Sequence, residues 1–230
     1  MKYKFLSQEH LKLIACCLML LDHIGCMNII PGLYSELRVI GRLAFPIFCF
    51  LLCEGFAHTK SKKRYLARLA ISAVLSEIPF DLMLFGRLTF DAQNVMVTLF
   101  LGLLMAACME KTDKSWLKIL LIVPFYAVAE IVRCDYQGVG ILMIAIFLLV
   151  KDLGKWTLPL QTVLLFAVSL LLNSARRGIF GIVVPIQIFS IFAMVPIALY
   201  NGRKLTCSPA VQWSFYLFYP VHMAILSLLW

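Results

Sequence analysis

The chain has 230 residues, of which 62% are hydrophobic and 14% charged, and its formal net charge is +9. Soluble domains are about half apolar and about a quarter charged, so this composition argues against a soluble enzyme and predicts a polytopic membrane protein. The 21 Lys and Arg residues cluster in short segments between apolar runs. Because that clustering is a topological feature of membrane proteins, we expect membrane lipid around the chain and no nucleic-acid partner.

Apolar runs recur along the whole chain and predict one all-α transmembrane domain over residues 1–230. About 20 apolar residues are enough to cross a bilayer as a helix. The pattern gives about nine spans, at 11–30, 37–57, 65–85, 94–110, 117–133, 138–150, 156–173, 179–200 and 213–229. The sixth is short and must be tilted, thin or partly re-entrant, and Pro185 and Pro196 predict a kink or break in the eighth.

The loop charges predict the orientation of these spans. With the N-terminus in the cytoplasm, 15 of the 21 Lys and Arg residues lie on the cytoplasmic side and six on the outer side. Only Arg176 and Arg177 depart from this asymmetry. The sequence therefore predicts a multi-pass protein of the cytoplasmic (inner) membrane, with its N-terminus inside and its C-terminus outside.

The first span contains two adjacent ionisable residues, Asp22 and His23, which are unexpected inside an apolar segment. At about 1.5 Å per residue, His23 lies about 16 Å beyond Lys12, past the middle of the hydrocarbon. An acid and an imidazole at that depth are costly unless they have partners, which makes them a functional-site hypothesis. Their side chains point about 100° apart on a helix, so they do not simply satisfy each other.

Other ionisable residues are predicted at a similar depth, about 18 Å from the cytoplasmic edge. These residues, which would surround one polar cavity with Asp22 and His23 in the outer half of the membrane, are Arg42, Glu77, Glu130 and His222. At the cytoplasmic level, Lys12 and Glu54 come close in depth and form a candidate pair.

Each of these residues also has a structural alternative. Arg42 is a candidate to neutralise Asp22 and lock two helices together. Glu77 precedes Pro79 and is a candidate to serve the backbone that this proline frees. Glu130 and Arg133, at i and i+3, are candidates for a local pair. His222 is a candidate for a hydrogen-bonded core histidine.

The residue types favour general-base chemistry. A neutral imidazole is a base near neutral pH and takes a proton from an amine or hydroxyl nucleophile, while a carboxylate fixes its tautomer. A basic segment at the cytoplasmic mouth suits a polyanionic donor, and its residues are Lys60, Lys62, Lys63 and Arg64.

Several motifs resemble the TraX family, the F-pilin acetylation proteins and their chromosomal relatives. The motifs cover essentially the whole chain: Leu11–Ala15 before Asp22–Gly25, then Ile40–Phe48, Glu54–Phe56, His58–Thr59, Tyr65–Leu66, Arg68–Leu69, Glu77–Phe80, Asn94 with Thr98–Leu99, Tyr200–Arg203 and Phe218–His222. That family is grouped with membrane acyltransferases of the acyltransferase type 3 and heparan-glucosaminide acetyltransferase kind. Their first span carries a basic residue, ten intervening residues and a histidine, as Lys12 and His23 do here.

The resemblance implies an integral membrane acetyltransferase that uses cytoplasmic acetyl-CoA on an acceptor at the outer side. His23 is implied as the catalytic base, with Asp22, Arg42, Glu77 and His222 as further candidate site residues. The candidate residues for the donor are Lys12, Glu54, Lys63, Arg64, Arg68 and Asn201. The resemblance leaves the acceptor open: a pilin N-terminal amine, or another amine or hydroxyl of the envelope.

Two other functions fit the same sequence. Intramembrane Asp, Glu and His are also expected in a proton-coupled transporter, although no inverted repeat is visible. The second alternative is a non-catalytic membrane subunit of an envelope or conjugation assembly. Hydrolysis of a CoA ester, or bound CoA, distinguishes the enzyme from both.

Overall fold

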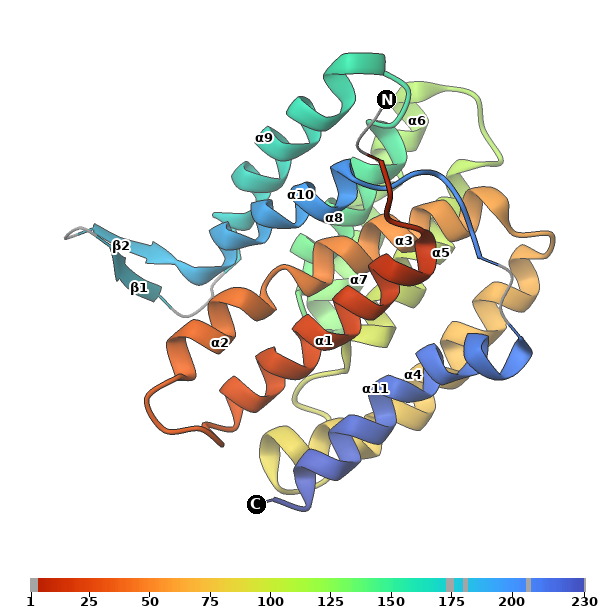
Figure 1. Cartoon of the computed structure of the whole chain (residues 1–230). Helices are drawn as coiled ribbons and strands as arrows, with labels where there is room; N and C mark the ends of the chain where they lie inside the picture. The colour runs from red at the N-terminus through yellow and green to blue at the C-terminus, as the bar shows by residue number, and fades with distance from the viewer. Residues whose placement is uncertain (1–3, 173–175, 180–181, 206–207, 230) are drawn as a thin grey trace. The chain divides into compact units, whose positions relative to one another are not determined.

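The computed structural model describes residues 4–172, 176–179, 182–205 and 208–229 (Figure 1). In these residues the chain is predominantly α-helical, as predicted, with one two-stranded hairpin. The contacts divide it into two compact units. Unit 1 comprises Met1–Leu51 and Val150–Phe215, and unit 2 comprises Leu52–Leu149 and Tyr216–Trp230. Helices α3 (Ala44–His58) and α11 (Pro209–Ser227) each contribute residues to both units.

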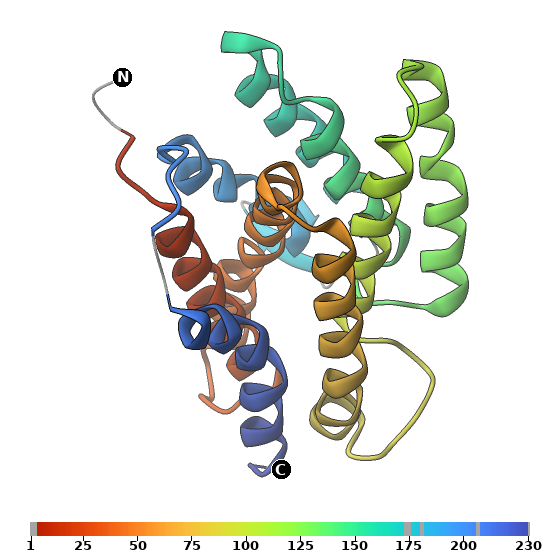
Figure 2. The same ribbon diagram turned by 90° about the vertical axis from the view of Figure 1, so that its right-hand side faces the viewer.

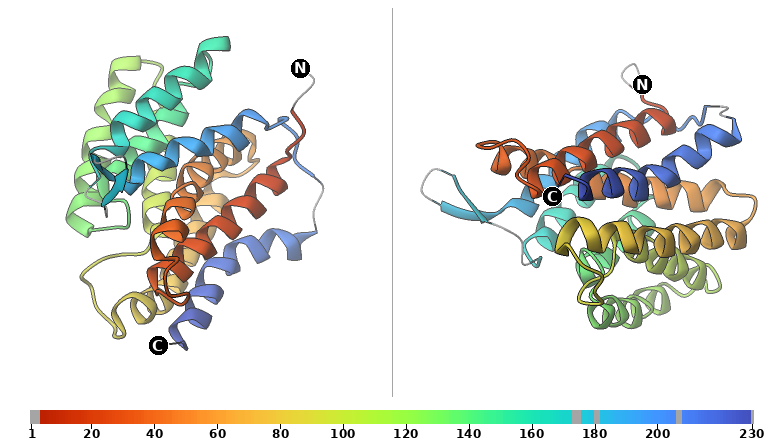
Figure 3. Two further views of the ribbon diagram at one scale, coloured as in Figure 1. Left: turned by 60° about the vertical axis from the view of Figure 1, so that its left-hand side comes forward. Right: turned by 90° about the horizontal axis from the view of Figure 1, so that it is seen from below.

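Unit 1 begins with two helices that lie side by side (Figures 1 and 3), α1 (Gln8–Cys26) and α2 (Tyr34–Gly41). Two glycines let them approach closely. A Cβ atom at Gly25 would lie 2.8 Å from Cβ of Leu37, and one at Gly41 would overlap the side chain of Asp22. The backbone of α2 therefore rests directly on α1 beside that carboxylate.

The predicted span 37–57 is interrupted between α2 and α3, at Arg42 and Leu43. Pro46 explains the interruption, because proline has no N–H to donate to the carbonyl of Arg42 and its ring clashes with that group. The sequence prediction of one continuous helix missed this break. Its consequence is that Arg42 lies at a bend, directly after the last turn of α2.

The start of the chain pairs with the segment before α11. The N–H groups of Phe5 and Leu6 both lie 3.0 Å from the carbonyl oxygen of Leu199, and the N–H of Asn201 donates to Leu6 at 2.9 Å. Ser7 then caps α1 by accepting a hydrogen bond from the N–H of His10. These contacts fix the beginning of α1 in unit 1.

The eighth predicted span, 179–200, is helical only in part. Strands β1 (Arg176–Ile179) and β2 (Ile182–Pro185) form an antiparallel hairpin, with Ile179 opposite Ile182. A 3₁₀ helix η2 (Ile186–Ala193) and a short α10 (Met194–Ala198) follow. The predicted break at Pro185 is confirmed, since helical structure begins directly after it. Residue 173 of the seventh predicted span and residues 180–181 of the eighth lie outside the described residues.

The rest of unit 1 comprises η1 (Gly154–Trp156) and α9 (Thr157–Ser169), which contacts η2 and α10. Unit 2 contains α4 (Lys62–Phe85), α5 (Val95–Met109), α6 (Ser115–Leu120), α7 (Ile122–Val132) and α8 (Gln137–Leu149). Figure 2 shows the connection from α4 to α5, residues 86–94, as a long open loop. Gly86, in the left-handed conformation with φ of 64°, ends α4.

Helix α8 forms the centre of unit 2 and packs against α5 and α7. Ile141, Met143 and Ile144 on α8 are fully buried. Gly102 of α5 makes room for Ile144, since a Cβ at Gly102 would overlap that side chain. A helix that is apolar on all sides is buried on all sides, and this explains why the short sixth span lies inside the unit.

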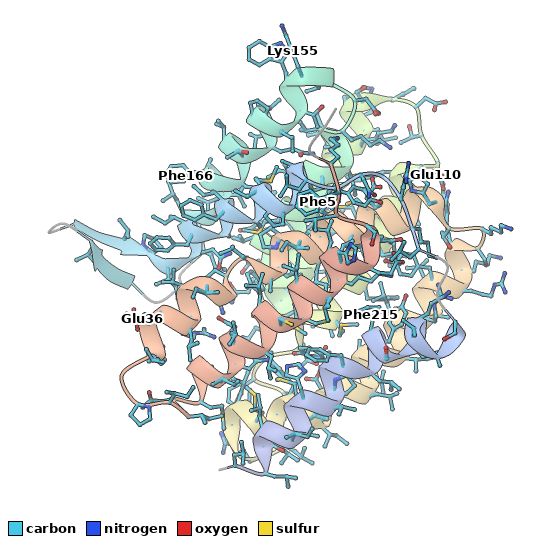
Figure 4. All side chains as sticks on the ribbon, viewed as in Figure 1. Phe5, Glu36, Glu110, Lys155, Phe166 and Phe215 are labelled. Carbon is cyan, nitrogen blue, oxygen red and sulfur yellow. The ribbon has the colours of Figure 1, made fainter. Side chains whose placement is uncertain are left out.

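The surface of both units is unusually apolar. Val123 and Ile131 of α7 are 62% and 79% exposed, Val74 of α4 is 74% exposed, and Phe166 of α9 (labelled in Figure 4) is 42% exposed. Two described helical segments, Tyr34–His58 (α2 with α3) and Ser115–Val132 (α6 with α7), are long and apolar enough to cross a membrane. Helices α5, α8 and Ile186–Ala198 are apolar but shorter. These segments are fewer than the nine transmembrane spans predicted from the sequence, so the described structure does not show nine spans.

Candidate functional site

In unit 1, Asp22 is buried against two arginines of the α2 segment. Nη1 of Arg38 lies 2.7 Å from Oδ2 of Asp22. Nε of Arg42 lies 3.3 Å from Oδ1, and Nη2 of Arg42 contacts Oδ2. Asp22 is 7% exposed and Arg42 is 8% exposed, so solvent screens this ion cluster weakly.

Local sequence explains how two guanidinium groups reach one carboxylate. Arg38 and Arg42 are four residues apart, so their side chains leave the same face of α2. Gly41 brings the α2 backbone against Asp22, and the bend imposed by Pro46 leaves Arg42 just beyond the last turn. We call Asp22, Arg38 and Arg42 the arginine clamp.

The clamp confirms the alternative in which Arg42 neutralises Asp22 and joins two helices. Arg38 was not predicted, although its four-residue spacing from Arg42 was a readable signal. Nε of Arg38 is buried and donates no hydrogen bond.

His23 follows Asp22 on α1 and is half-buried. Both carboxylate oxygens of Asp22 accept hydrogen bonds from arginine, so Asp22 anchors the arginine clamp. The assignment of His23 as a catalytic base stays a prediction, supported by its place beside this clamp.

Two predicted donor residues also lie in unit 1. Nζ of Lys12 is 5.2 Å from the ring centre of Phe215, which Figure 4 labels on α11. Asn201 uses its Oδ1 to accept a hydrogen bond from the N–H of Arg203 at 2.8 Å. The side chain of Asn201 thus shapes its own turn, while Lys12 lies on an aromatic face with its ammonium group near the start of α1.

In unit 2, Glu77 holds the beginning of α5. Oε2 of Glu77 accepts hydrogen bonds from Nδ2 and, at 3.4 Å, from the backbone N–H of Asn94. Asn94 in turn caps α5 by accepting from the N–H of Met96 at 2.9 Å. The alternative in which Glu77 serves the backbone freed by Pro79 is wrong. Oε2 of Glu77 bonds to Asn94 and its Oε1 has no hydrogen-bond partner, so neither oxygen binds the carbonyl that Pro79 leaves without a donor.

Glu130 binds the strained turn between α7 and α8. Oε1 of Glu130 accepts a hydrogen bond from the N–H of Gly138 at 3.1 Å. Arg133, Tyr136 and Gln137 adopt left-handed φ angles of 55°, 63° and 49°. Among the described residues, no ion pair joins Glu130 to Arg133, so that local pairing is wrong. Arg133 has left the helical conformation on which an i,i+3 pair depends.

His222 on α11 is 5% exposed and stacks on Phe218, with ring centres 4.7 Å apart. Its Nδ1 lies 2.6 Å from the carbonyl oxygen of Phe218 and donates to it. This fixes the tautomer and makes Nε2 the basic nitrogen of the neutral ring. The alternative of a hydrogen-bonded core histidine is confirmed.

The predicted basic mouth lies at the start of α4. Lys63 and Arg64 are exposed, and the half-buried guanidinium of Arg68 is 5.7 Å from the ring centres of both Tyr65 and Tyr216. Nε of Arg68 is buried and donates no hydrogen bond.

Two neighbouring charges already have partners. Lys62 is paired with Glu110, which follows α5 and is labelled in Figure 4. Glu54 lies 4.0 Å from Nδ1 of His58, one turn further along α3. Among the residues of unit 2 that were predicted to bind the acetyl donor, Lys63, Arg64 and Arg68 remain as cations for an anionic ligand.

The predicted cavity draws on both units. Asp22, His23 and Arg42 belong to unit 1, whereas Glu77, Glu130 and His222 belong to unit 2. Their meeting in one cavity stays a prediction, and so does the pairing of Lys12 with Glu54.

Comparison with known proteins decides the family. A sequence model described as TraX protein matches residues 7–230. The chain belongs to the TraX family. The resemblance drawn from its motifs is thereby confirmed, and the match spans the arginine clamp, the basic mouth and both candidate histidines, His23 and His222.

Two curated proteins are similar to this TraX chain. The probable fimbrial assembly protein FimC, serogroup H1, of Dichelobacter nodosus is 35% identical over 237 residues, covering 96% of this chain and 94% of that protein. An uncharacterised protein of Rickettsia prowazekii (strain Madrid E) is 34% identical over 98 residues, covering 41% of this chain and 34% of that protein. No solved structure matches the chain.

Proposed function

We propose that this TraX protein is a multi-pass membrane acetyltransferase that uses acetyl-CoA to acetylate an amine or hydroxyl of an envelope protein such as a pilin. The arginine clamp beside His23 carries the proposal. His23 follows Asp22 on α1, and Asp22 binds the half-buried guanidinium of Arg38, whose Nε–H has no acceptor. A base and an adjacent unused donor are the two parts that acyl transfer requires.

The proposed step is direct transfer. The lone pair of the acceptor attacks the thioester carbonyl carbon while His23 takes the acceptor proton. Negative charge then develops on the carbonyl oxygen, where a donor such as Nε–H of Arg38 stabilises it. The carbon–sulfur bond breaks, and the leaving thiolate of CoA takes the proton from the His23 imidazolium. The products are acetylated acceptor and CoA.

Membrane insertion is part of the proposal. Apolar side chains cover the outside of α7 and the free faces of α4 and α9, and two helices are long enough to span. Exposing so large an apolar surface to water is unfavourable, whereas its contact with the hydrocarbon of a lipid bilayer is favourable. We therefore assign the chain to the inner membrane with several crossings, the N-terminus and the Lys60–Arg68 loop inside. A membrane-impermeant thiol reagent should then fail to label a cysteine introduced in that loop of intact cells.

The donor is proposed to bind at the basic mouth. Lys63 and Arg64 offer exposed charge at the first turn of α4, where the helix dipole also favours phosphate. Arg68 adds the buried Nε–H. Lys12 of unit 1 is the further candidate for a CoA phosphate. The distant relationship to the acyltransferase type 3 group is proposed with this assignment.

The printed name of the Dichelobacter relative supports a second candidate, a fimbrial assembly component without catalysis. One experiment separates the two. The purified full chain in detergent is incubated with acetyl-CoA and a peptide bearing a free N-terminal amine, and released CoA is measured by chromatography. The enzyme releases CoA in proportion to peptide acetylation, whereas an assembly component releases none above the protein-free blank.

A further inference from the structure

Two carboxylates of unit 2 share one face of α4 near its C-terminal end. Glu77 and Asp81 are four residues apart, so their Cβ atoms lie about 6 Å from each other. They interact electrostatically as like charges. Asp81 is 3% exposed, whereas Glu77 is half-buried, so the pair is closed on one side and reachable on the other.

Each carboxylate uses one oxygen to hold the 86–94 loop. Oδ2 of Asp81 accepts from the N–H of Thr89 at 2.9 Å, and Oε2 of Glu77 accepts from Asn94 at the loop's end. The other oxygen of each, Oδ1 of Asp81 and Oε1 of Glu77, is buried and accepts no hydrogen bond. A buried acceptor without a partner destabilises the fold, and more so when it is charged.

The groups around the pair do not neutralise it. The donors to it are backbone N–H groups and an amide, all uncharged. In the described part of the chain, no Lys, Arg or His forms an ion pair with Glu77 or Asp81, and Arg87 of the same loop pairs with Asp91 instead.

The elements packed against the pair contribute further acids. The phenol of Tyr219 on α11 interacts electrostatically with Glu77 and with Asp135, which lies between α7 and α8. Ionisation of both the buried Asp81 and the neighbouring half-buried Glu77 is unfavourable without a compensating cation, because solvent offsets their repulsion only in part and no counter-charge among the described residues does.

We propose that Glu77 and Asp81 together bind one small monovalent cation, a proton or Na⁺, between their two unpartnered oxygens. Both carboxylates also hold the 86–94 loop, so occupancy of this site fixes the connection from α4 to α5. This inference is independent of acetyl transfer.

The test is the thermal unfolding midpoint of the full chain in detergent, at constant ionic strength. If the ion is a proton, the wild-type midpoint in choline chloride is higher at pH 6 than at pH 8 by at least about 2 °C. If it is Na⁺, replacing choline by Na⁺ at pH 8 raises the midpoint by a similar amount. In either case Asp81→Asn removes the effect, and Asp91→Asn, which changes an exposed acid of the same loop, keeps it.

A second variant and a second measurement protect the test against a misfolded Asp81→Asn protein. Glu77→Gln should remove the same dependence. In wild-type protein, infrared difference spectra between pH 6 and pH 8 should show the band of a protonated carboxylic acid for a bound proton and none for Na⁺. The site would be overturned if the unfolding midpoint of both variants responded to pH and to Na⁺ as strongly as that of wild type. It would also be overturned if only Mg²⁺ or Ca²⁺ stabilised the protein.

Discussion

The two units bury their acids in opposite ways. In unit 1 a single carboxylate, Asp22, meets two guanidinium groups, and all three side chains come from adjacent helices. In unit 2 two carboxylates, Glu77 and Asp81, meet only uncharged donors from one loop. The comparison teaches that an acid held by guanidinium groups has its charge balanced within the fold, whereas the acids held by uncharged donors leave one oxygen each without a partner.

The largest effect is expected from removing the charge of the anchor. Asp22→Asn removes the carboxylate charge that pairs with the half-buried Arg38 and the buried Arg42, and loss of one partner of a buried pair costs about 3–5 kcal/mol. We expect a matching fall in the free energy of unfolding in detergent. As a control, Glu110→Gln breaks the exposed Lys62–Glu110 pair and should cost less than about 1 kcal/mol. Equal losses in the two variants would show that the clamp is no anchor.

The next largest effect concerns the uncharged donors of unit 2. Asn94→Ala removes the cap of α5 and both the amide bond to Glu77 and the bond to the Ala73 carbonyl. Loss of a helix cap costs about 1 kcal/mol, and the stranded acceptor of Glu77 adds about 1–3 kcal/mol. Asn94→Asp keeps the cap but places a third carboxylate beside the pair. If Asn94→Asp is as stable as wild type at pH 8, the unit 2 site is not electrostatically strained.

A smaller effect is expected from disturbing the close packing of α2 on α1, which brings Arg38 and Arg42 to Asp22. Gly41→Ala places a methyl group where the side chain of Asp22 lies, and overpacking costs about 1–3 kcal/mol. The free energy of unfolding of this variant in detergent, and its rate of CoA release, test this expectation. A variant with unchanged stability and activity would contradict the close approach of α2 to α1.

The smallest effect is expected at the donor site. Lys12→Ala removes one proposed phosphate contact and should raise the KM for acetyl-CoA several-fold with little change in kcat. Lys151→Ala, an exposed lysine far along the sequence, is the matched control. If the two variants raise KM equally, Lys12 does not bind the donor.

Much of this comparison was readable in the sequence. Apolar content predicted the helices, and depth along a helix predicted that Arg42 would meet Asp22. The i,i+4 spacing that adds Arg38 to the clamp and Asp81 to Glu77 was equally visible. Spacing shows only that two residues share a helix face, whereas the fold decides which of them meet a partner.

The remaining features depend on tertiary contacts that periodicity does not contain. The bend at Arg42 follows from Pro46 and was predictable, but the approach of Gly41 to Asp22 was not. The region 176–198 is apolar enough for a span, yet it forms a hairpin and a 3₁₀ helix, because hydropathy alone does not distinguish a short strand from a helix. The role of Asn94 as a bridge from Glu77 to α5 also required the fold.

The most direct measurement of the central claim is CoA release by His23→Ala. The account predicts a folded protein that still binds acetyl-CoA but releases CoA at least about 10²-fold more slowly than wild type, the usual contribution of a positioned base. His58→Ala, which removes an exposed histidine of α3, should match wild type. Acetyl-His23 trapped without acceptor would replace direct transfer by a two-step route. Acetylation by His23→Ala at the wild-type rate would contradict the account.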